Sequence, residues 1–355
     1  MKYRLLAEYD ARFGAVMLAW PHEETDWAPI LDDARACYVG IVGALTAVGC
    51  PVLIVTPHPD EVTDDLRAPG SDGDITIVRV DTNDTWTRDY GPLTIEGSDG
   101  TLTAADFCFN GWGMKFAANF DNRVNARLHS LAPATPYIDC LDTVLEGGSI
   151  ETDGCGTVLT TAECLLSVNR NDFHNKSEAE EMLRDKLGAR RVLWLDYGAL
   201  EGDDTDSHID TLARMAPDDT IIYVKSYRPD DSHTPGLERM EQQLRDMRTE
   251  GGEPYRLVPV PLPEPCFEPD DGHRLPATYA NFLITPKAVI MPLYGQPDND
   301  ERARTALETI FSPERRVIGV DCRALIRQHG SLHCATMQLP LAFVNEIKKS
   351  IAHER

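Results

Sequence analysis

Residues 156–195 read GTVLTTAECLLSVNRNDFHNKSEAEEMLRDKLGARRVLWL and predict two strands with a helix between them. Residues 156–161 and 191–195 are short apolar runs with glycine and polar residues around them, which is the pattern of strands. Between them, Ser177 is followed three residues later by Glu180, the spacing of a capping box at the start of a helix. This strand–helix–strand order decides the fold, because it recurs along the chain.

The same order of elements recurs at a nearly constant interval. Helical patterns begin near residues 31, 119, 177, 236 and 299, and the last four starts are 58, 59 and 63 residues apart. Strand-like runs fall between them, at residues 15–20, 51–55, 74–80, 220–224, 255–260, 280–284, 288–294 and 315–320. Such periodicity indicates repeated structural units. No linker or change of composition divides the chain, so we expect residues 1–355 to form one α/β domain.

The composition argues against several classes of protein. The chain of 355 residues has a formal net charge of −24, which argues against binding the phosphates of nucleic acid. The same charge fits a cationic ligand, although solubility is the simpler explanation. No apolar run approaches the roughly 20 residues of a membrane span, and Glu8, Asp10 and Arg12 interrupt any signal-peptide core. Nine cysteines without a C-x-x-C pair predict reduced thiols, a cytoplasmic location and no structural zinc site.

Four segments place polar or ionisable residues beside strands, where a core would not need them. They read NDTWTRDYGP, LEGGSI, SHID and GSLHCAT, at residues 83–92, 145–150, 207–210 and 330–336. The first would present Asp89 at the end of a strand, with Trp86 as an aromatic wall. The two glycines of the second allow a tight turn or the close approach of another group. Each segment on its own is also compatible with an ordinary capped loop.

The last two segments supply an imidazole and a thiol. If residues 207–210 are extended, His208 and Asp210 point to the same side. If residues 330–336 form a strand, Cys334 and His333 point to opposite sides, and His333 faces outward. A cysteine in an apolar strand is usually inert, so its chemistry depends on the partners that the rest of the chain places around it.

Thiol chemistry needs a thiolate, an imidazole for proton transfer and groups that hold the electrophile. Cys334 and His208 would supply the first two, while Asp89, Asp210 and Glu146 would add three carboxylates. Three negative charges hinder the ionisation of a thiol unless a cation lies among them. A guanidinium is such a cation, because its planar fork of N–H donors matches paired carboxylates. The residues therefore indicate a small cationic guanidino substrate.

In this order, the segments WTRDYGP, LEGGS, HID and GSLHC resemble the agmatine deiminase and bacterial-type peptidylarginine deiminase family of the guanidine-modifying (pentein) superfamily. Further similar stretches are MLAWPHEETDW, FNGWG, TAECLLSVNRN, TYANFLI and CATMQLP, so the resemblance covers nearly the whole chain. It implies a five-bladed α/β propeller of ββαβ units around a central active site. This architecture agrees with the period of the elements.

The resemblance also implies roles for individual residues. Cys334 matches the nucleophile, His208 and Asp210 match the G-H-x-D segment, and Asp89 matches the W-x-R-D segment. Glu146 matches the residue that orients the histidine. Trp86 matches the residue that flanks the guanidinium, and Asn281 matches a residue near the nucleophile. The implied reaction is hydrolysis through a covalent thiouronium-like adduct, with no metal or other cofactor.

Two departures from the family lie in these segments. Ser207 stands where the family has glycine, and His329-Gly330-Ser331 stands where plant-type agmatine deiminases have Gly-Gly-Asn. Both departures concern the identity of the substrate more than the type of reaction.

Agmatine is the expected substrate, with N-carbamoylputrescine and ammonia as products and a place in polyamine metabolism. The resemblance implies that members of the family that act on C-terminal peptidylarginine need arginines on the loop after the first catalytic aspartate, and none occurs between Asp89 and Arg123. Conversion of protein arginine to citrulline is the alternative. Two hypotheses from other classes are a degenerate guanidine-binding protein and a metal-dependent hydrolase with four ligands, His208, Asp210, His333 and Cys334. A homo-oligomer is compatible with each hypothesis.

Overall fold

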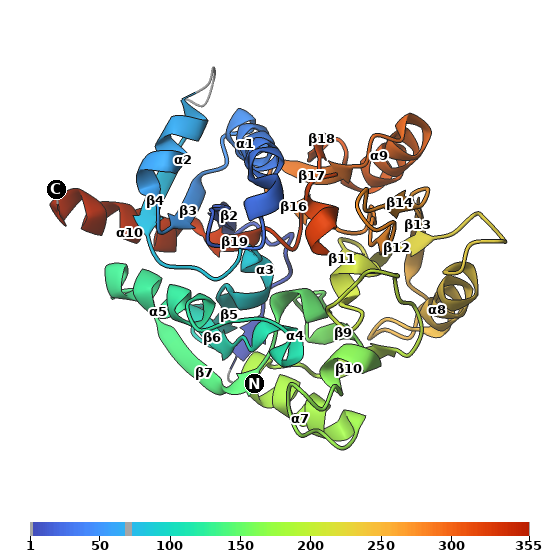
Figure 1. Cartoon of the computed structure of the whole chain (residues 1–355). Coiled ribbons are helices and arrows are strands. Elements are labelled where there is room, and N and C mark those ends of the chain that lie inside the picture. The colour runs from blue at the N-terminus through green and yellow to red at the C-terminus, as the bar shows by residue number, and fades with distance from the viewer. Residues whose placement is uncertain (1–2, 68–72, 355) are drawn as a thin grey trace.

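Five β-sheets surround a common centre, and one of them is the unit expected for residues 156–195 (Figure 1). The computed structural model describes residues 3–67 and 73–354. In this unit β8 (Ile150–Thr152) runs antiparallel to β9 (Thr157–Thr161). Helix α7 (Lys176–Leu187) follows, and β10 (Arg191–Leu195) then runs parallel to β9. The unit is therefore ββαβ.

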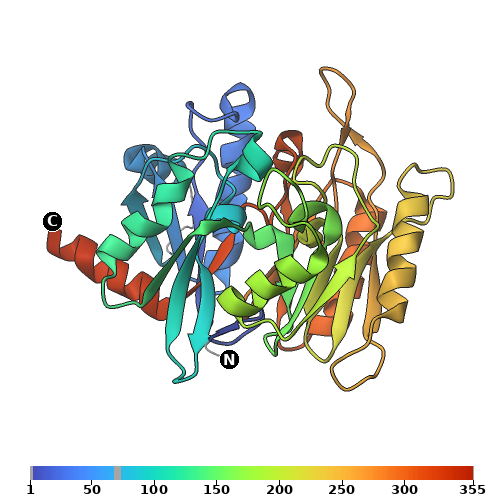
Figure 2. The same ribbon diagram turned by 90° about the horizontal axis from the view of Figure 1, so that it is seen from below.

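Three further units have the same order and the same strand directions, and Figure 2 shows their sheets and helices from below. Their helices begin within two residues of the predicted starts. The first comprises β5 (Leu93–Gly97), β6 (Leu102–Cys108), α5 (Asp121–Leu131) and β7 (Tyr137–Val144). The second comprises β11 (Ala213–Ala216), β12 (Thr220–Lys225), α8 (Thr234–Asp246) and β13 (Arg256–Pro261). The third comprises β16 (Leu283–Ile284), β17 (Ala288–Leu293), α9 (Pro297–Phe311) and β18 (Arg316–Asp321).

The fifth unit joins the two ends of the chain. Its first strand is β19 (Met337–Pro340), which runs antiparallel to β2 (Phe13–Ala19). Helix α1 (Leu31–Ala47) and β3 (Val52–Thr56) complete the ββαβ order, and β3 is parallel to β2. This pairing closes the ring, so the prediction of a five-bladed α/β propeller is confirmed.

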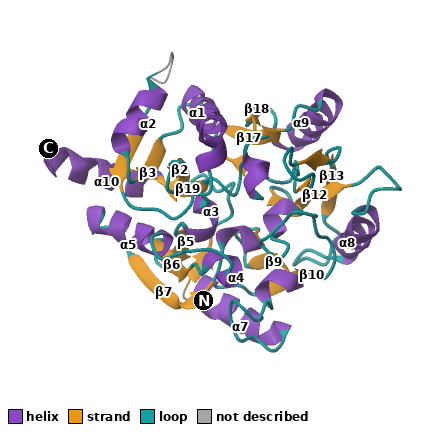
Figure 3. Cartoon of the chain, in the orientation of Figure 1, coloured by secondary structure: helices purple, strands orange, loops and turns teal. Residues whose placement is uncertain are grey.

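The remaining elements extend the blades or lie between them. Helix α2 (Pro59–Leu66) leads to β4 (Ile75–Arg79), which pairs with β3, and β1 (Tyr3–Leu5) pairs with β5. The others are α6 (Ala162–Leu165), β14 (Cys266–Phe267), β15 (Arg274–Leu275), α10 (Leu341–Glu354) and the short helices η1 (Ala28–Ile30), α3 (Thr87–Tyr90), α4 (Gly111–Met114), η2 (Gly147–Ser149), η3 (Ile209–Thr211) and η4 (Leu325–Gln328). In Figure 3 α3 lies near the centre of the ring of strands.

The core forms between the sheets and the helices that cover them. Tyr38, Ile41 and Leu45 follow helical spacing along α1 and are fully buried, so this helix packs one apolar face onto its sheet. The start of α7 differs from the prediction, because Asn175 rather than Ser177 is the capping residue and accepts a hydrogen bond from the Glu178 amide. None of the helices in the described part of the chain is long and apolar enough to cross a membrane.

Candidate active site

Three of the four polar segments meet at Gly148. A Cβ atom placed on this residue would lie 2.7 Å from Asp89 Oδ1, 2.7 Å from His208 Nδ1 and 3.1 Å from Asp210 Oδ2. At the preceding position, a Cβ on Gly147 would lie 2.2 Å from the Arg88 carbonyl oxygen. The close approach expected from the LEGGS segment is therefore confirmed, because only residues without a side chain fit at both positions.

Asp89 is held on both of its carboxylate oxygens. Oδ1 accepts a hydrogen bond of 3.0 Å from the Gly148 amide, and Oδ2 accepts one of 2.8 Å from the indole Nε1 of Trp112. His208 Nδ1 lies 3.6 Å from Oδ1. Burial raises the pKa of Asp89 to about 6, although the charge of His208 opposes the shift. Trp112 belongs to FNGWG, a segment that the sequence marked as similar to the family without assigning it to the site.

His208 is fully buried at the bottom of the site. Burial would lower the pKa of its imidazole, but Asp89, Cys164 and Glu146 together outweigh this effect, and the pKa is raised well above the ordinary value. The imidazolium is therefore the form present at neutral pH. His208 and Asp210 were expected on an extended segment, whereas η3 begins directly after His208 and curves the chain so that both still reach Gly148.

Cys334 lies in a turn, not in a strand. Its Sγ is 3.2 Å from Asn281 Nδ2 and 3.7 Å from Asp210 Oδ2. Asn281 Oδ1 accepts hydrogen bonds from the backbone amides of His333 (2.8 Å) and Cys334 (3.3 Å), which directs the amide nitrogen toward the sulfur. Burial, together with the charges of Asp210 and Asp89, raises the pKa of the Cys334 thiol well above its ordinary value. The free protein therefore holds a protonated thiol.

His333 does not face outward, and that prediction is wrong. Because the segment turns, the ring is buried, with Nδ1 2.7 Å from Asp210 Oδ2 and Nε2 2.6 Å from Glu8 Oε2. Burial would raise the pKa of both carboxyl groups, but several neighbouring groups together outweigh it, above all Arg214 at Glu8 and the hydrogen bond with His333 at Asp210, so both pKa values are lowered. Each ring nitrogen of His333 therefore faces a carboxylate oxygen. In the described part of the chain, the side-chain clusters that could hold a metal ion include neither His333 nor Cys334, so the ligand set His208, Asp210, His333 and Cys334 does not form such a cluster.

Glu146 lies close to His208, as expected, but its hydrogen bonds go elsewhere. Arg170 Nε donates to both carboxylate oxygens of Glu146 at 2.9 Å, and Arg170 Nη1 donates to Asp206 Oδ2 at 2.6 Å. Glu146, His208 and the buried Cys164 place one ligand atom each within 4.8 Å of one another, so they could hold a metal ion. The Arg170 guanidinium already neutralises Glu146, however, which makes this cluster a poor cation site.

A small cavity of about 80 Å³ opens above the thiol. Its apolar walls are Trp86, Trp112 and Phe116, so the aromatic wall expected at Trp86 is present. Among the lysine, arginine, aspartate and glutamate side chains of residues 3–67 and 73–354, only four line it, and all four are acidic: Asp26, Asp84, Asp89 and Asp204. Burial raises the pKa of Asp84 to about 7 and that of Asp204 to about 6. Nearby, Lys115 is bound to Asp206 at 2.7 Å. The cavity therefore suits a small cation.

Comparison with known proteins decides the family. The sequence profile of the Porphyromonas-type peptidyl-arginine deiminases matches residues 4–340. The chain belongs to this family. One solved member, from Porphyromonas gingivalis and named "putative arginine deiminase", is 45% identical, with a TM-score of 0.89 over 96% of this chain and 99% of the other.

Relatives whose names include agmatine have a lower sequence identity to this chain. A C. jejuni agmatine deiminase with a cysteine-to-serine change and substrate bound is 35% identical, with a TM-score of 0.87 over 95% of this chain and 96% of that one. A curated relative from Shewanella sp. (strain MR-4), named "putative agmatine deiminase", is 31% identical over 346 residues, which cover 92% of this chain and 91% of the relative.

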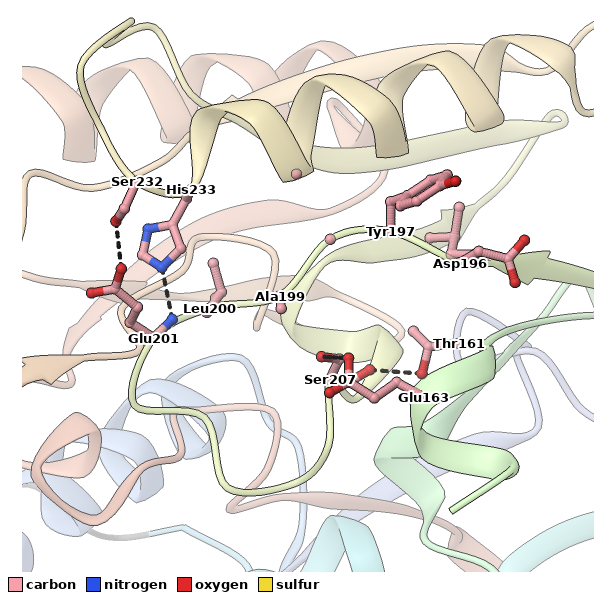
Figure 4. Close-up of a pocket in the computed structure, with 13 residues that line it drawn as sticks. Thr161, Glu163, Asp196, Tyr197, Ala199, Leu200, Glu201, Ser207, Ser232 and His233 are labelled. Carbon is pink, nitrogen blue, oxygen red and sulfur yellow. Dashed lines mark hydrogen bonds between the residues drawn. The ribbon is translucent and has the colours of Figure 1, made fainter. Parts of the chain in front are cut away.

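The two departures from the deiminase family pattern occur at strained backbone positions. Ser207 has φ +63° and His329 has φ +65°, in the left-handed region that favours glycine. Each side chain makes a local bond: Ser207 Oγ donates to Glu163 Oε2 at 2.8 Å, and His329 Nδ1 lies 2.7 Å from the Gly202 carbonyl oxygen. Figure 4 shows Ser207 beside Glu163 in a second pocket of about 470 Å³, separate from the cavity above the thiol.

The packing of Trp86 explains why position 330 is a glycine. A Cβ on this residue would lie 2.4 Å from a ring carbon of Trp86, so glycine lets the indole lie against the backbone. Ser331 Oγ is 2.8 Å from the hydroxyl of Tyr294. His329 and Gly330 thus form one wall of the cavity, with Trp86 packed on Gly330.

Proposed function

We propose that this protein hydrolyses the guanidino group of agmatine, giving N-carbamoylputrescine and ammonia. The observation that carries the proposal is a thiol at the base of a small cavity whose charged walls are all acidic. The C. jejuni agmatine deiminase and an agmatine deiminase of Enterococcus faecalis, which is 26% identical with a TM-score of 0.84, support it. Residues 1–355 would act as one catalytic domain without a cofactor, and a cytoplasmic location and a homo-oligomer stay predictions.

The guanidinium would be held before it reacts. Asp89 and Asp210, both beside Gly148, are suited to accept its N–H groups, and the indole of Trp86 would flank its plane. Cys334 is protonated in the free protein because burial and two carboxylates raise its pKa. The positive charge of the bound guanidinium opposes these carboxylates, so the thiol would lose its proton to water as substrate binds. Asn281 would then donate to the thiolate.

The reaction would proceed in two halves. In the first, the Cys334 thiolate forms a bond to the central guanidinium carbon, and His208 gives its proton to the departing nitrogen, so that the C–N bond breaks and ammonia leaves. A thiouronium-like adduct remains on the sulfur. In the second half, the neutral His208 takes a proton from water, whose oxygen attacks the same carbon. The C–S bond then breaks as the remaining hydroxyl proton passes to the solvent, which releases the ureido product and the thiolate.

Peptidylarginine deimination is the second candidate, because the family name and the 45% identical structure both point to arginine. The cavity favours agmatine over it. Its volume of about 80 Å³ is far below the roughly 300–1,000 Å³ of pockets for drug-sized ligands, and a peptide would need more room. The carboxylate of a terminal arginine would also meet Asp26, Asp84 and Asp204, whereas the ammonium of agmatine would be attracted to them.

A substrate comparison tests this choice. We expect kcat/KM for agmatine to exceed that for free arginine and for a peptide with C-terminal arginine by at least about tenfold, measured as ureido product.

Asp204→Asn should raise KM for agmatine about 10- to 100-fold, because one charge-assisted contact is lost, and leave KM for 1-butylguanidine unchanged. Asp230→Asn, on an exposed loop, is the control. A kcat/KM that is much higher for arginine peptides than for agmatine would reject agmatine as the substrate but retain the hydrolytic mechanism. If no guanidine gives a ureido product, the protein is better explained as a guanidine-binding protein.

The ionisation of the Asp89 carboxyl group predicts how kcat/KM changes with pH on the acidic side. This carboxyl group must be ionised to hold the guanidinium, and its pKa is raised to about 6. We therefore expect log kcat/KM for 1-butylguanidine to gain about one unit of slope against pH below 6, in addition to the dependence that ionisation of the Cys334 thiol gives at higher pH. The fall should be steeper for agmatine, because its ammonium also depends on Asp204, whose pKa is raised to about 6. A slope that does not change down to pH 4.5, in protein shown to be folded, would contradict the proposed role of Asp89.

A further inference from the structure

A second cluster of ionisable side chains lies outside the candidate active site, where the loop after β2 meets the start of α2. His58 Nε2 is 3.3 Å from Glu24 Oε2, and His22 Nδ1 is 3.5 Å from the same oxygen. One ligand atom from each of the three residues lies within 4.8 Å of the other two. The two imidazole rings meet edge to face, with centroids 5.5 Å apart. Two imidazoles and a carboxylate are a common zinc-binding set.

His22 is built into the fold in the way that metal-binding histidines are. Its side chain is 2% exposed, and Nε2 lies 3.1 Å from Thr82 Oγ1. If Nε2–H donates to this hydroxyl, Nδ1 carries the lone pair, and among the described residues this buried Nδ1 has no hydrogen-bond partner. A second hydrogen bond that fixes the tautomer is typical of a histidine ligand. A buried nitrogen without a partner is costly, so this nitrogen indicates an absent ligand.

The separations suit a tetrahedral ion. Bonds of about 2.0–2.1 Å to zinc place neighbouring ligand atoms about 3.3 Å apart, and two of the three separations are already 3.3 and 3.5 Å. Glu24 and His58 are partly exposed, so they are free to adjust. We propose that His22 Nδ1, the Glu24 carboxylate and His58 Nε2 bind one divalent metal ion of the zinc type, with water in the fourth position.

The charges around the cluster agree with this assignment. The guanidinium of Arg35, which donates to the Pro21 carbonyl oxygen, is held by Glu61 and by Asp65 at 3.6 Å. The net charge of −24 further raises the local concentration of divalent cations.

The metal ion would act on the structure around the cavity and not on the reacting atoms. The loop that carries His22 and Glu24 continues to Asp26, which lines the cavity, and to Trp27. The Trp27 ring packs 5.6 Å from that of Trp86, and its Nε1 donates to Thr85 Oγ1 at 3.0 Å. A metal ion joining this loop to the start of α2 would hold the wall of the cavity in place.

Titration of the chelator-treated full chain with Co²⁺ and Zn²⁺ tests the site. We expect one ion per chain by calorimetry, a Co²⁺ spectrum with tetrahedral d–d bands and no thiolate charge-transfer band, and a higher Tm in the presence of Zn²⁺. His58→Ala and Glu24→Gln should each weaken binding at least about tenfold. Both residues are partly exposed, so neither change threatens folding. His174→Ala, an exposed histidine elsewhere, should bind as the native protein does.

Three results would overturn the proposal. The first is no binding of either ion at millimolar concentration. The second is equal binding by the native protein and His58→Ala. The third is a thiolate band in the Co²⁺ spectrum, which would place the ion at Cys164 or Cys334 instead. None of these outcomes depends on turnover, so the proposed function and the metal site can fail independently.

Discussion

Replacement of Cys334 by alanine is expected to lower the formation of ureido product from agmatine by at least about 10³-fold. The alanine side chain occupies the same turn but offers no atom that can bond to the guanidinium carbon. The fold should survive, because the change removes one sulfur atom from a site where Asn281 still binds the backbone amides. The measurement is ureido product by a colorimetric assay, together with the mass of protein quenched in acid during turnover.

The mass measurement distinguishes the nucleophile from its neighbours. Native protein should carry the amidino adduct on the peptide that contains Cys334, and Cys334→Ala should carry none. Cys155→Ala is the matched control, because this thiol is exposed and is not among the residues that line the cavity, so both adduct and activity should persist. Activity in Cys334→Ala within tenfold of the native level would mean that the covalent mechanism is wrong.

The architecture could be predicted from the sequence because it depends on local patterns. Helical periodicity and apolar runs are properties of neighbouring residues, and the helix starts they predict agree with the structure to within two residues. The closure of the ring by β19 and β2 could not come from such patterns. It joins residues more than 300 positions apart, and it entered the prediction only through the resemblance to a family.

The candidate site was predictable only in part. Cys334, His208, Asp89 and Asp210 lie together as expected, because each sits in a segment with an unusual polar pattern. Asn281 lies with them, and it was expected there only through the resemblance to a family. Their roles stay predictions. The partners Glu8, Arg170 and Trp112 were missed, since each reaches the site from a distant segment.

The side chain of His333 was predicted to face outward, and the structure gives the physical reason why that prediction is wrong. Alternation of faces holds only in an extended strand, and Ala335 N donates instead to the Ser331 carbonyl oxygen in a turn. The turn rotates the imidazole inward, where Asp210 and Glu8 bind it. A sequence of seven mostly small and apolar residues does not distinguish a strand from such a turn.

Gly148→Ala should reduce kcat/KM for agmatine by about 10²-fold or more while the chain still folds. Gly148 has no positive φ, so alanine suffers no backbone strain there, and the whole effect comes from the added methyl group. That methyl group would lie 2.7 Å from Asp89 Oδ1 and from His208 Nδ1, closer than such atoms approach. The carboxylate and the imidazole must then move, and displacement of reacting groups by about 1 Å can cost 10²-fold in rate.

The control for this change is Gly43→Ala. Gly43 lies on α1 with open space around the position of its Cβ, so alanine should raise the free energy of unfolding by about 0.5–1 kcal/mol and leave kcat/KM unchanged. Gly148→Ala should instead lower the free energy of unfolding by about 1–3 kcal/mol, as overpacking does. Denaturant unfolding and steady-state kinetics measure the two effects. If Gly148→Ala keeps kcat/KM within threefold, the reaction does not require Asp89, His208 and Asp210 to meet at this point of the backbone.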